Sequence, residues 1–147
     1  MQVLVVEDDV MLADCLAEAL LDHGHVVCGV VSTVADAVAL ARRYHPDAAI
    51  LDMNLNSRER GSDIADQLAA SGDLGHTGIL YVTGASDRVQ QEVRVGHACL
   101  NKPYTHASLG TALEIVRDIA CDGTSSRPLP RGLQLLRQAE RAASTTH

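Results

Sequence analysis

The sequence predicts an α/β protein built on a doubly wound, five-stranded parallel sheet, and two patterns lead to this prediction. Five short apolar runs alternate with segments of helical spacing, at intervals of roughly 25 residues. Such runs are typical of strands buried on both faces, and parallel strands need helical crossovers between them. For five strands a common order is 2-1-3-4-5, with a binding site at the carboxyl ends of strands one and three. A length of 147 residues suits one such domain.

The first part of the chain supplies two strands and a helix. Residues 2–6 are a continuous Val-rich run, which indicates a buried strand. Apolar residues then recur at helical spacing from Met11 to Leu20, and Gly24 is a suitable end for this helix. Residues 26–31 are a second apolar run and form the second expected strand.

The alternation continues through the rest of the body. Thr33 with Asp36 three positions later is typical of a helix start, and Pro46 ends that helix. The third apolar run, residues 48–51, stops directly before Asp52. The remaining expected elements are a polar loop at 54–61, a helix around Ile64 and Leu68, a strand at 78–82, a polar helix at 88–95, a short strand at 98–100 and a helix from Leu109 to Ala120.

The end of the chain differs from the body in composition and charge. Residues 123–130 (GTSSRPLP) predict a linker, because Gly, Ser and two prolines cannot sustain a helix. Residues 131–143 regain helical spacing and predict a short amphipathic helix that is too short to fold alone. From Gly123 onward, four arginines against one glutamate give a net charge of +3, so the acidic body carries −10 of the total of −7. We therefore expect one domain at residues 1–121 and a linker with a basic tail at 122–147.

Composition limits the class of protein further. The net charge of −7 argues against a nucleic-acid-binding surface, which needs a basic patch. Four cysteines without Cys-x-x-Cys spacing suggest small buried side chains in a reducing compartment. No secretory signal precedes the first strand, and no apolar stretch approaches the ~20 residues that span a bilayer. We expect a cytoplasmic protein that does not contact membranes.

Polar residues that can bind a metal or take part in a reaction follow four of the five expected strands. They are Glu7 and Asp8 after the first strand, Asp52 after the third, Thr83 after the fourth and Lys102 after the fifth. In a parallel sheet these positions meet at one rim. Three carboxylates there would repel one another by a few kcal/mol at an effective dielectric near 20, so a cation is expected between them. Oxygen ligands with room for water suit Mg²⁺.

A metal held by carboxylates beside a lysine and a hydroxyl is suited to phosphoryl transfer. The metal and Lys102 would neutralise the phosphoryl oxygens, and Thr83 would add a hydrogen bond. Asp52, at the tip of the central strand, is the best-placed nucleophile for an acyl phosphate. A purely structural interpretation exists for single residues, since Asp8 or Asp9 can cap the first helix.

These residues resemble the receiver domain of two-component response regulators, over about residues 1–121. The matching motifs are VLVVEDD, AAILDMNL, YVTG and LNKPY. The resemblance implies a flavodoxin-like receiver fold in which Asp52 takes a phosphoryl group from a phosphohistidine of a sensor histidine kinase or phosphotransfer protein. It also implies that Mg²⁺ is held by the side chains of Asp8 and Asp52, by the backbone carbonyl of Asn54, and by Glu7 through a water. Lys102 would pair with Asp52 and then with the phosphoryl group, and the bond from Lys102 to Pro103 is often cis in this family.

Three features depart from the receiver pattern. Cys99 stands where receivers carry a Tyr or Phe that moves inward with the threonine, and Gly84 stands where Ala or Ser is more common. The loop after Asp52 has Asn56 in place of proline and reaches Gly61 one residue late. With these departures the sequence resembles a subclass of receivers that lacks the aromatic switch and often occurs without an output domain. We expect phosphorylation to reshape residues 84–95 rather than to swing a ring.

Three other functions are weaker. A Mg²⁺-dependent aspartyl phosphatase usually has a second aspartate two residues after its nucleophile, where Asn54 stands here. A flavodoxin-like cofactor protein needs a phosphate loop after the first strand, where the acids at 7–9 would repel the phosphate. A receiver-like module that is never phosphorylated stays open. The sequence favours a signalling protein over an enzyme.

Output is expected through protein–protein contacts. The residues after the linker are too few for a helix-turn-helix domain, so direct DNA binding is not expected. The basic tail can lie against the acidic body, or it can bind a second copy through Leu133 and Leu136 and form a homodimer. The downstream protein is not identified by these residues.

Overall fold

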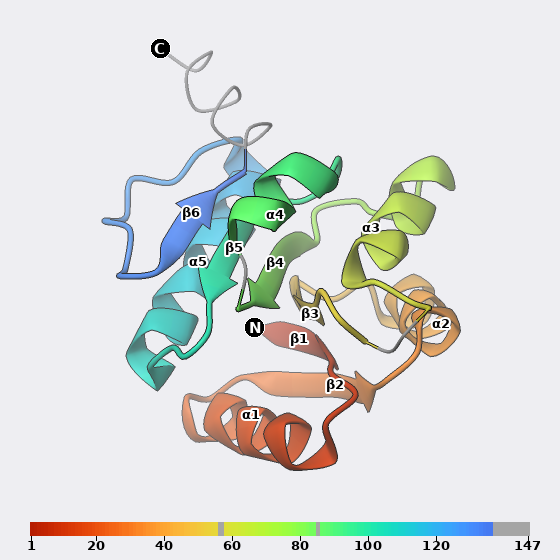
Figure 1. The fold of residues 1–147 in the computed structure, drawn as a ribbon, viewed down its shortest axis with the longest axis horizontal. Coiled ribbons are helices and arrows are strands. Elements are labelled where there is room, and N and C mark those ends of the chain that lie inside the picture. The colour runs from red at the N-terminus through yellow and green to blue at the C-terminus, as the bar shows by residue number, and fades with distance from the viewer. Residues whose placement is uncertain (56–57, 85, 137–147) are drawn as a thin grey trace.

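A six-stranded sheet with helices on both faces forms the body of the protein (Figure 1). The structure is a computed structural model that describes residues 1–55, 58–84 and 86–136. Within this part of the chain the strand order is β2-β1-β3-β4-β5-β6. The strands are β1 (Gln2–Val6), β2 (Val26–Val31), β3 (Ala48–Asp52), β4 (Gly78–Thr83), β5 (Ala98–Asn101) and β6 (Leu133–Leu135). The first five are parallel in the predicted order, which confirms the doubly wound sheet.

The helices cover the two faces of the sheet and divide the core in two. On one face, α1 (Val10–Asp22) and α5 (His106–Asp122) pack on Val3, Val5 and Ile50. On the other face, α2 (Val34–Tyr44), α3 (Gly61–Ala70) and α4 (Ser86–Glu92) enclose the second apolar cluster. Both clusters are mainly aliphatic, as the scarcity of aromatic residues requires.

Short polar side chains begin the helices near the sheet rim. The carboxylate of Asp9 accepts hydrogen bonds from the amides of Met11 and Leu12, so Asp9 rather than Asp8 caps α1. Thr33 caps α2 as predicted, by accepting from the Asp36 amide. Capping by Asp9 leaves the neighbouring carboxylate of Asp8 available to the rim.

The predicted helix at 131–143 is wrong for its first part, which is a strand. Residues 133–135 pair antiparallel with β5, and residues 137–143 lie outside the described residues. Gly132 has a φ of 85°, which turns the chain into the open edge of β5. Leu133 and Leu136 are spaced for one side of a helix, but in this extended segment they enter the two opposite core clusters. The division of the chain at residue 122 stays a prediction.

Two further expectations concern the cysteines and membranes. All four cysteines are free, as expected, but Cys15 and Cys121 are exposed rather than buried. In the described ranges no helix has both the length and the apolar character to cross a bilayer.

Candidate functional site

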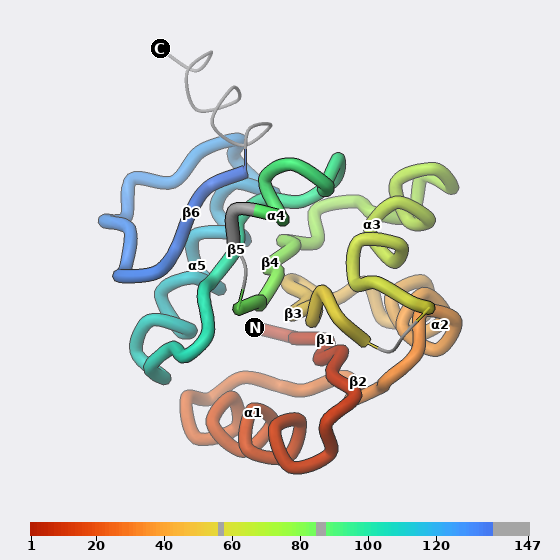
Figure 2. Tube along the Cα trace, viewed as in Figure 1, coloured from red at the N-terminus to blue at the C-terminus, as the bar shows by residue number. Residues whose placement is uncertain are grey.

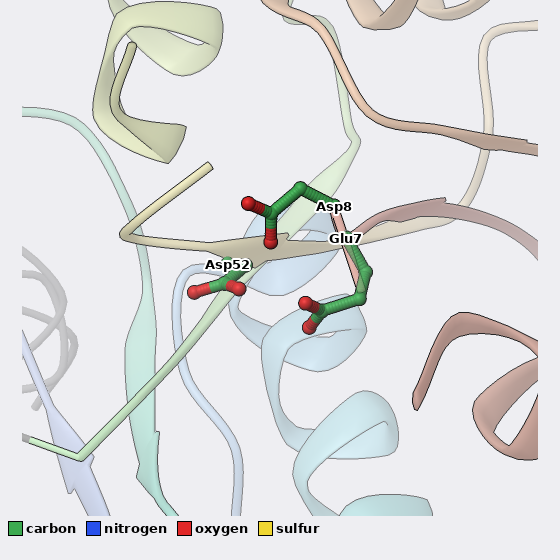
Figure 3. A group of neighbouring side chains, drawn as sticks. All are labelled: Glu7, Asp8 and Asp52. Atoms are coloured by element: carbon green, nitrogen blue, oxygen red, sulfur yellow. The ribbon is translucent and has the colours of Figure 1, made fainter. Parts of the chain in front are cut away.

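The carboxyl ends of β1 and β3 bring three acidic side chains together. The strands pair in parallel, with Val6 beside Leu51, so Glu7 and Asp8 leave β1 next to the end of β3 at Asp52. Figure 3 shows the three carboxylates gathered around one space. One oxygen from each lies within 4.8 Å of the others. The site that the sequence predicted at the sheet rim is therefore present as a cluster of acidic side chains.

The cluster is closed on one side and open on the other. Glu7 and Asp52 are only 7% and 5% exposed, whereas Asp8 is exposed to solvent. Burial raises the pKa of Glu7 most, and together with the hydrogen bond to Asp52 and the charge of Asp52 it brings this pKa to about 7. Glu7 therefore holds a proton more tightly than an ordinary glutamate does, as expected where negative charge is concentrated.

Lys102 supplies a cation to this cluster. Its Nζ lies 3.6 Å from Asp52 Oδ2 and 3.7 Å from Glu7 Oε2. The amide of Lys102 donates to the carbonyl of Thr83 at 2.8 Å, and the bond to Pro103 is cis, as the resemblance implied. One lysine against three carboxylates leaves two negative charges when all are ionised. That charge and an oxygen-only donor set fit a hard divalent cation such as Mg²⁺.

The loop that leaves β3 is folded back onto Asp52. The amide of Asn54 donates to Asp52 Oδ1 at 3.0 Å, and the amide of Gly61 donates to the carbonyl of Met53 at 3.3 Å. A Cβ on Gly61 would collide with the Asp52 carbonyl, which explains a glycine at this position. Asn54 therefore lies at the rim beside Asp52, while Asn56 falls outside the described residues.

Thr83 reaches the same rim from β4. Val82 is the β4 partner of Asp52, so Thr83 extends one residue beyond it. Thr83 is only 3% exposed. All the residues predicted from the strand ends thus meet at one edge of the sheet.

Cys99 is fully buried in the middle of β5. It shares the second core cluster with Tyr81, Val89 and Leu136, and burial raises the pKa of its thiol to about 12. The thiol is therefore protonated and serves as an apolar packing group. The contact of this cluster with Leu136 was missed from the sequence, because the leucine spacing indicated a helix.

A cavity lies beside the acidic cluster, and no sequence pattern predicted it. This cavity has a volume of about 430 Å³, and Glu7 and Lys102 are among its lining residues. The remaining lining comes from α1, from the loop between β5 and α5, and from the first residue of α5, and consists of Leu12, Cys15, Leu16, Pro103, Tyr104 and His106. A cavity formed by two elements that are distant in sequence has no local signature.

Residues 3–114 match the family model of the response regulator receiver domain. The match covers most of the chain, and the fold and the acidic rim agree with it. The chain belongs to the response regulator receiver domain family.

Relatives and solved structures of receiver domains are similar to the chain. The transcriptional regulatory protein PdtaR of Mycobacterium tuberculosis is 30% identical over 115 residues, which are 78% of this chain and 55% of PdtaR. The chain therefore spans about half the length of this relative. The receiver domain of a modulated diguanylate cyclase from Desulfovibrio desulfuricans is 28% identical, with a TM-score of 0.67 over 82% of this chain and 95% of that chain.

A third similarity concerns the fold alone. The receiver domain of sensor histidine kinase PA1611 from Pseudomonas aeruginosa, solved with a magnesium ion in its active-site cleft, is 23% identical. Its TM-score is 0.71, and the match covers 79% of this chain and 96% of that chain.

Proposed function

We propose that this receiver domain accepts a phosphoryl group on Asp52 from a phosphohistidine, in a Mg²⁺-dependent reaction. The observation that carries the proposal is the meeting of Glu7, Asp8 and Asp52 within 4.8 Å, with Lys102 Nζ 3.6 Å from Asp52. An Asp52 oxygen would form a bond to phosphorus while the phosphorus–nitrogen bond breaks. The electron pair of that bond stays on the imidazole nitrogen of the donor.

The acidic rim supplies the ligands for the metal. The side chains of Asp8 and Asp52, the backbone carbonyl of Asn54 and a water held by Glu7 would bind Mg²⁺. The exposure of Asp8 supports this assignment, because Mg²⁺ keeps several waters and needs an open side. When bound, Mg²⁺ supplies charge neutralisation at the phosphoryl oxygens.

Lys102 and Thr83 complete the site. The ammonium of Lys102 lies between Glu7 and Asp52, where it can move from the carboxylate to a phosphoryl oxygen on Asp52. The hydroxyl of Thr83 would donate to another phosphoryl oxygen from β4. Both groups act by electrostatic stabilisation and form no covalent bond.

The partners follow from the chemistry. The donor is a sensor histidine kinase or a phosphotransfer protein, and the phosphorylated domain signals through protein–protein contacts in the cytoplasm. The acidic surface of the body makes direct binding to nucleic acid unfavourable. A homodimer is one form that such a contact can take.

The test uses acetyl phosphate as the phosphodonor. The full chain is incubated with acetyl phosphate and Mg²⁺, and intact mass is measured for the wild type, Asp52→Asn and the control Asp14→Asn, which alters an exposed acid of α1. We expect one added phosphoryl group in the wild type and in Asp14→Asn, none in Asp52→Asn, and none when Mg²⁺ is chelated. An unmodified wild type would favour the binding module that is never phosphorylated. Catalytic release of phosphate from a small ester would favour the phosphatase.

A further inference from the structure

The last described strand, β6, covers the edge of the sheet next to α4. Its residues pair with β5, with Leu100 opposite Leu133 and Ala98 opposite Leu135. The amide of Asn101 donates to the carbonyl of Gly132 at 2.9 Å, and the amide of Leu136 donates to the carbonyl of His97 at 3.0 Å. The edge of β5 is therefore occupied by a segment of the same chain (Figure 1).

Two leucines anchor this segment in the core. Leu133 is 6% exposed and packs on the α5 side of the sheet, while Leu136 is 4% exposed and packs on the α4 side. Leu136 shares its cluster with Val89 of α4. The α4 side of the core is therefore complete only while β6 is in place.

A side-chain hydrogen bond joins β6 to α4 directly. Gln90 Nε2 donates to the carbonyl of Leu135 at 2.8 Å. Helix α4 begins at Ser86, three residues after Thr83 of the phosphoryl-transfer rim. A shift of Thr83 toward a phosphoryl group would be passed to α4, and from α4 to the hydrogen bond with Leu135.

The segment between α5 and β6 has its own attachment. Arg127 forms ion pairs with Glu114 and Asp118 of α5, each at 3.0 Å, and Ser125 donates to Asp118 at 2.7 Å. Figure 2 follows the chain from α5 through this segment into β6. These contacts do not involve α4, so β6 can leave the sheet while the chain stays attached to α5 at Arg127.

We propose that β6 is a displaceable cover of the β5 edge, and that phosphorylation of Asp52 releases it through α4. The proposal rests on the function proposed above and names β6 as the element that responds to phosphorylation. Without phosphorylation, Gln90 and Val89 hold β6 in place. After phosphorylation, α4 follows Thr83, the Gln90 hydrogen bond breaks, and the edge of β5 becomes accessible.

The test is amide hydrogen exchange by NMR on the full chain, with Mg²⁺, before and after phosphorylation. The reporters are the amides of Asn101 and Leu136, which bond across the β5–β6 pair. The reference is the amide of Gly78, which bonds to Asp47 at the opposite end of β4. We expect the protection of both reporters to fall at least about tenfold while that of Gly78 stays unchanged.

Variants of α4 separate release of β6 from general loosening. Gln90→Ala removes the bond to Leu135, so Leu136 should already exchange faster without phosphate, and phosphorylation should change it less. Gln91→Ala alters the exposed neighbour on the same helix and should behave as the wild type. Unchanged exchange protection of the Gly78 amide verifies that each variant is folded.

Intact mass on the same samples distinguishes the two proposals. If phosphorylated protein forms and the protection of Asn101 and Leu136 is unchanged, the release of β6 is refuted and the function of Asp52 stands. If no phosphorylated protein forms, the proposed function fails and the release of β6 fails with it. Equal behaviour of Gln90→Ala and Gln91→Ala would also refute the role of α4.

Discussion

The backbone amide of Lys102 donates a 2.8 Å hydrogen bond to the carbonyl of Thr83. This bond joins the segment after β5 to the end of β4. The backbones that carry the Lys102 ammonium and the Thr83 hydroxyl are therefore held together by one contact. The Lys102 side chain then reaches Glu7 and Asp52 on the next two strands. The position of the ammonium is therefore set by the sheet itself rather than by a long loop.

Replacing Lys102 with methionine should slow phosphorylation without removing the acceptor. The variant keeps the length of the side chain but loses the charge that, in the proposed function, would stabilise the transferring phosphoryl group. We expect the rate with acetyl phosphate to fall by about 10²–10³-fold, the usual effect of removing one preorganised donor. Phosphorylated protein is quantified over time by intact mass. Arg117→Met, an exposed change on α5, is the control, and equal rates in the two variants would contradict the role of Lys102.

Mg²⁺ should stabilise the protein through the acidic cluster. A cation that binds only the folded state raises the free energy of unfolding by about 2.7 kcal/mol at one hundred times its Kd. Asp8→Asn should remove most of this gain. Without metal it should raise stability by about 1 kcal/mol, because one repelling charge is gone. Urea unfolding with Mg²⁺ and with chelator measures both effects.

The control for this prediction is Glu18→Gln, which removes an exposed acid on α1 outside the cluster. It should keep the full response to Mg²⁺. A response to Mg²⁺ in Asp8→Asn as large as in the wild type would place the cation elsewhere.

The rim was predictable because the sequence places its polar residues directly at the ends of apolar runs. Asp52 and Thr83 end buried strands, so the parallel sheet alone brings them to one edge. The roles proposed for these residues are not tested by the fold and stay predictions. What required the structure is the finer arrangement, such as the amide of Asn54 on Asp52 Oδ1, because loop conformation is not encoded in a simple period.

The tail was predicted wrongly for a physical reason. Leu133 and Leu136 are three positions apart. This spacing places two residues on one side of a helix, but it also places them on opposite faces of a strand that is buried on both faces. The strand forms because the edge of β5 makes hydrogen bonds with Gly132 and Leu136, and because an apolar cluster on each face of the sheet accepts one leucine. That edge is distant in sequence, so no local pattern reveals it.

The glycine at the start of α3 should tolerate no side chain. In Gly61→Ala the new Cβ would meet the carbonyl of Asp52, which is backbone and cannot rotate away. We expect a loss of about 1–3 kcal/mol in the free energy of unfolding, typical of overpacking. Phosphorylation should also slow, because the end of β3 must shift. Thermal and urea unfolding, with intact mass for the rate, measure these effects.

Gly110→Ala supplies the matched control. Gly110 lies inside α5, and a Cβ there would have nothing within 4 Å. The same substitution should therefore stabilise the protein by roughly 0.5–1 kcal/mol, since alanine favours a helix. If both variants were destabilised equally, the collision with Asp52 would not be the cause.

Half-buried His97 should make the protein less stable in mild acid. Its Nδ1 accepts a 2.8 Å hydrogen bond from the amide of Ile79, so the ring is neutral, and burial lowers its pKa from 6.5 to about 4. Below pH 6.5 the unfolded chain binds a proton that the folded chain does not. The stability that His97 contributes is therefore complete above pH 6.5 and is lost between pH 6.5 and 4. The loss at pH 5 should be about 2 kcal/mol.

His97→Asn isolates this effect. The Oδ1 of asparagine can accept from Ile79 in place of the ring nitrogen, and it does not titrate in this range. Urea unfolding at pH 7.5 and pH 5 should therefore show a smaller loss in the variant than in the wild type, by about 2 kcal/mol. His76→Asn, at an exposed histidine, should follow the wild type. An equal acid response in wild type and His97→Asn would show that other groups control stability in this range.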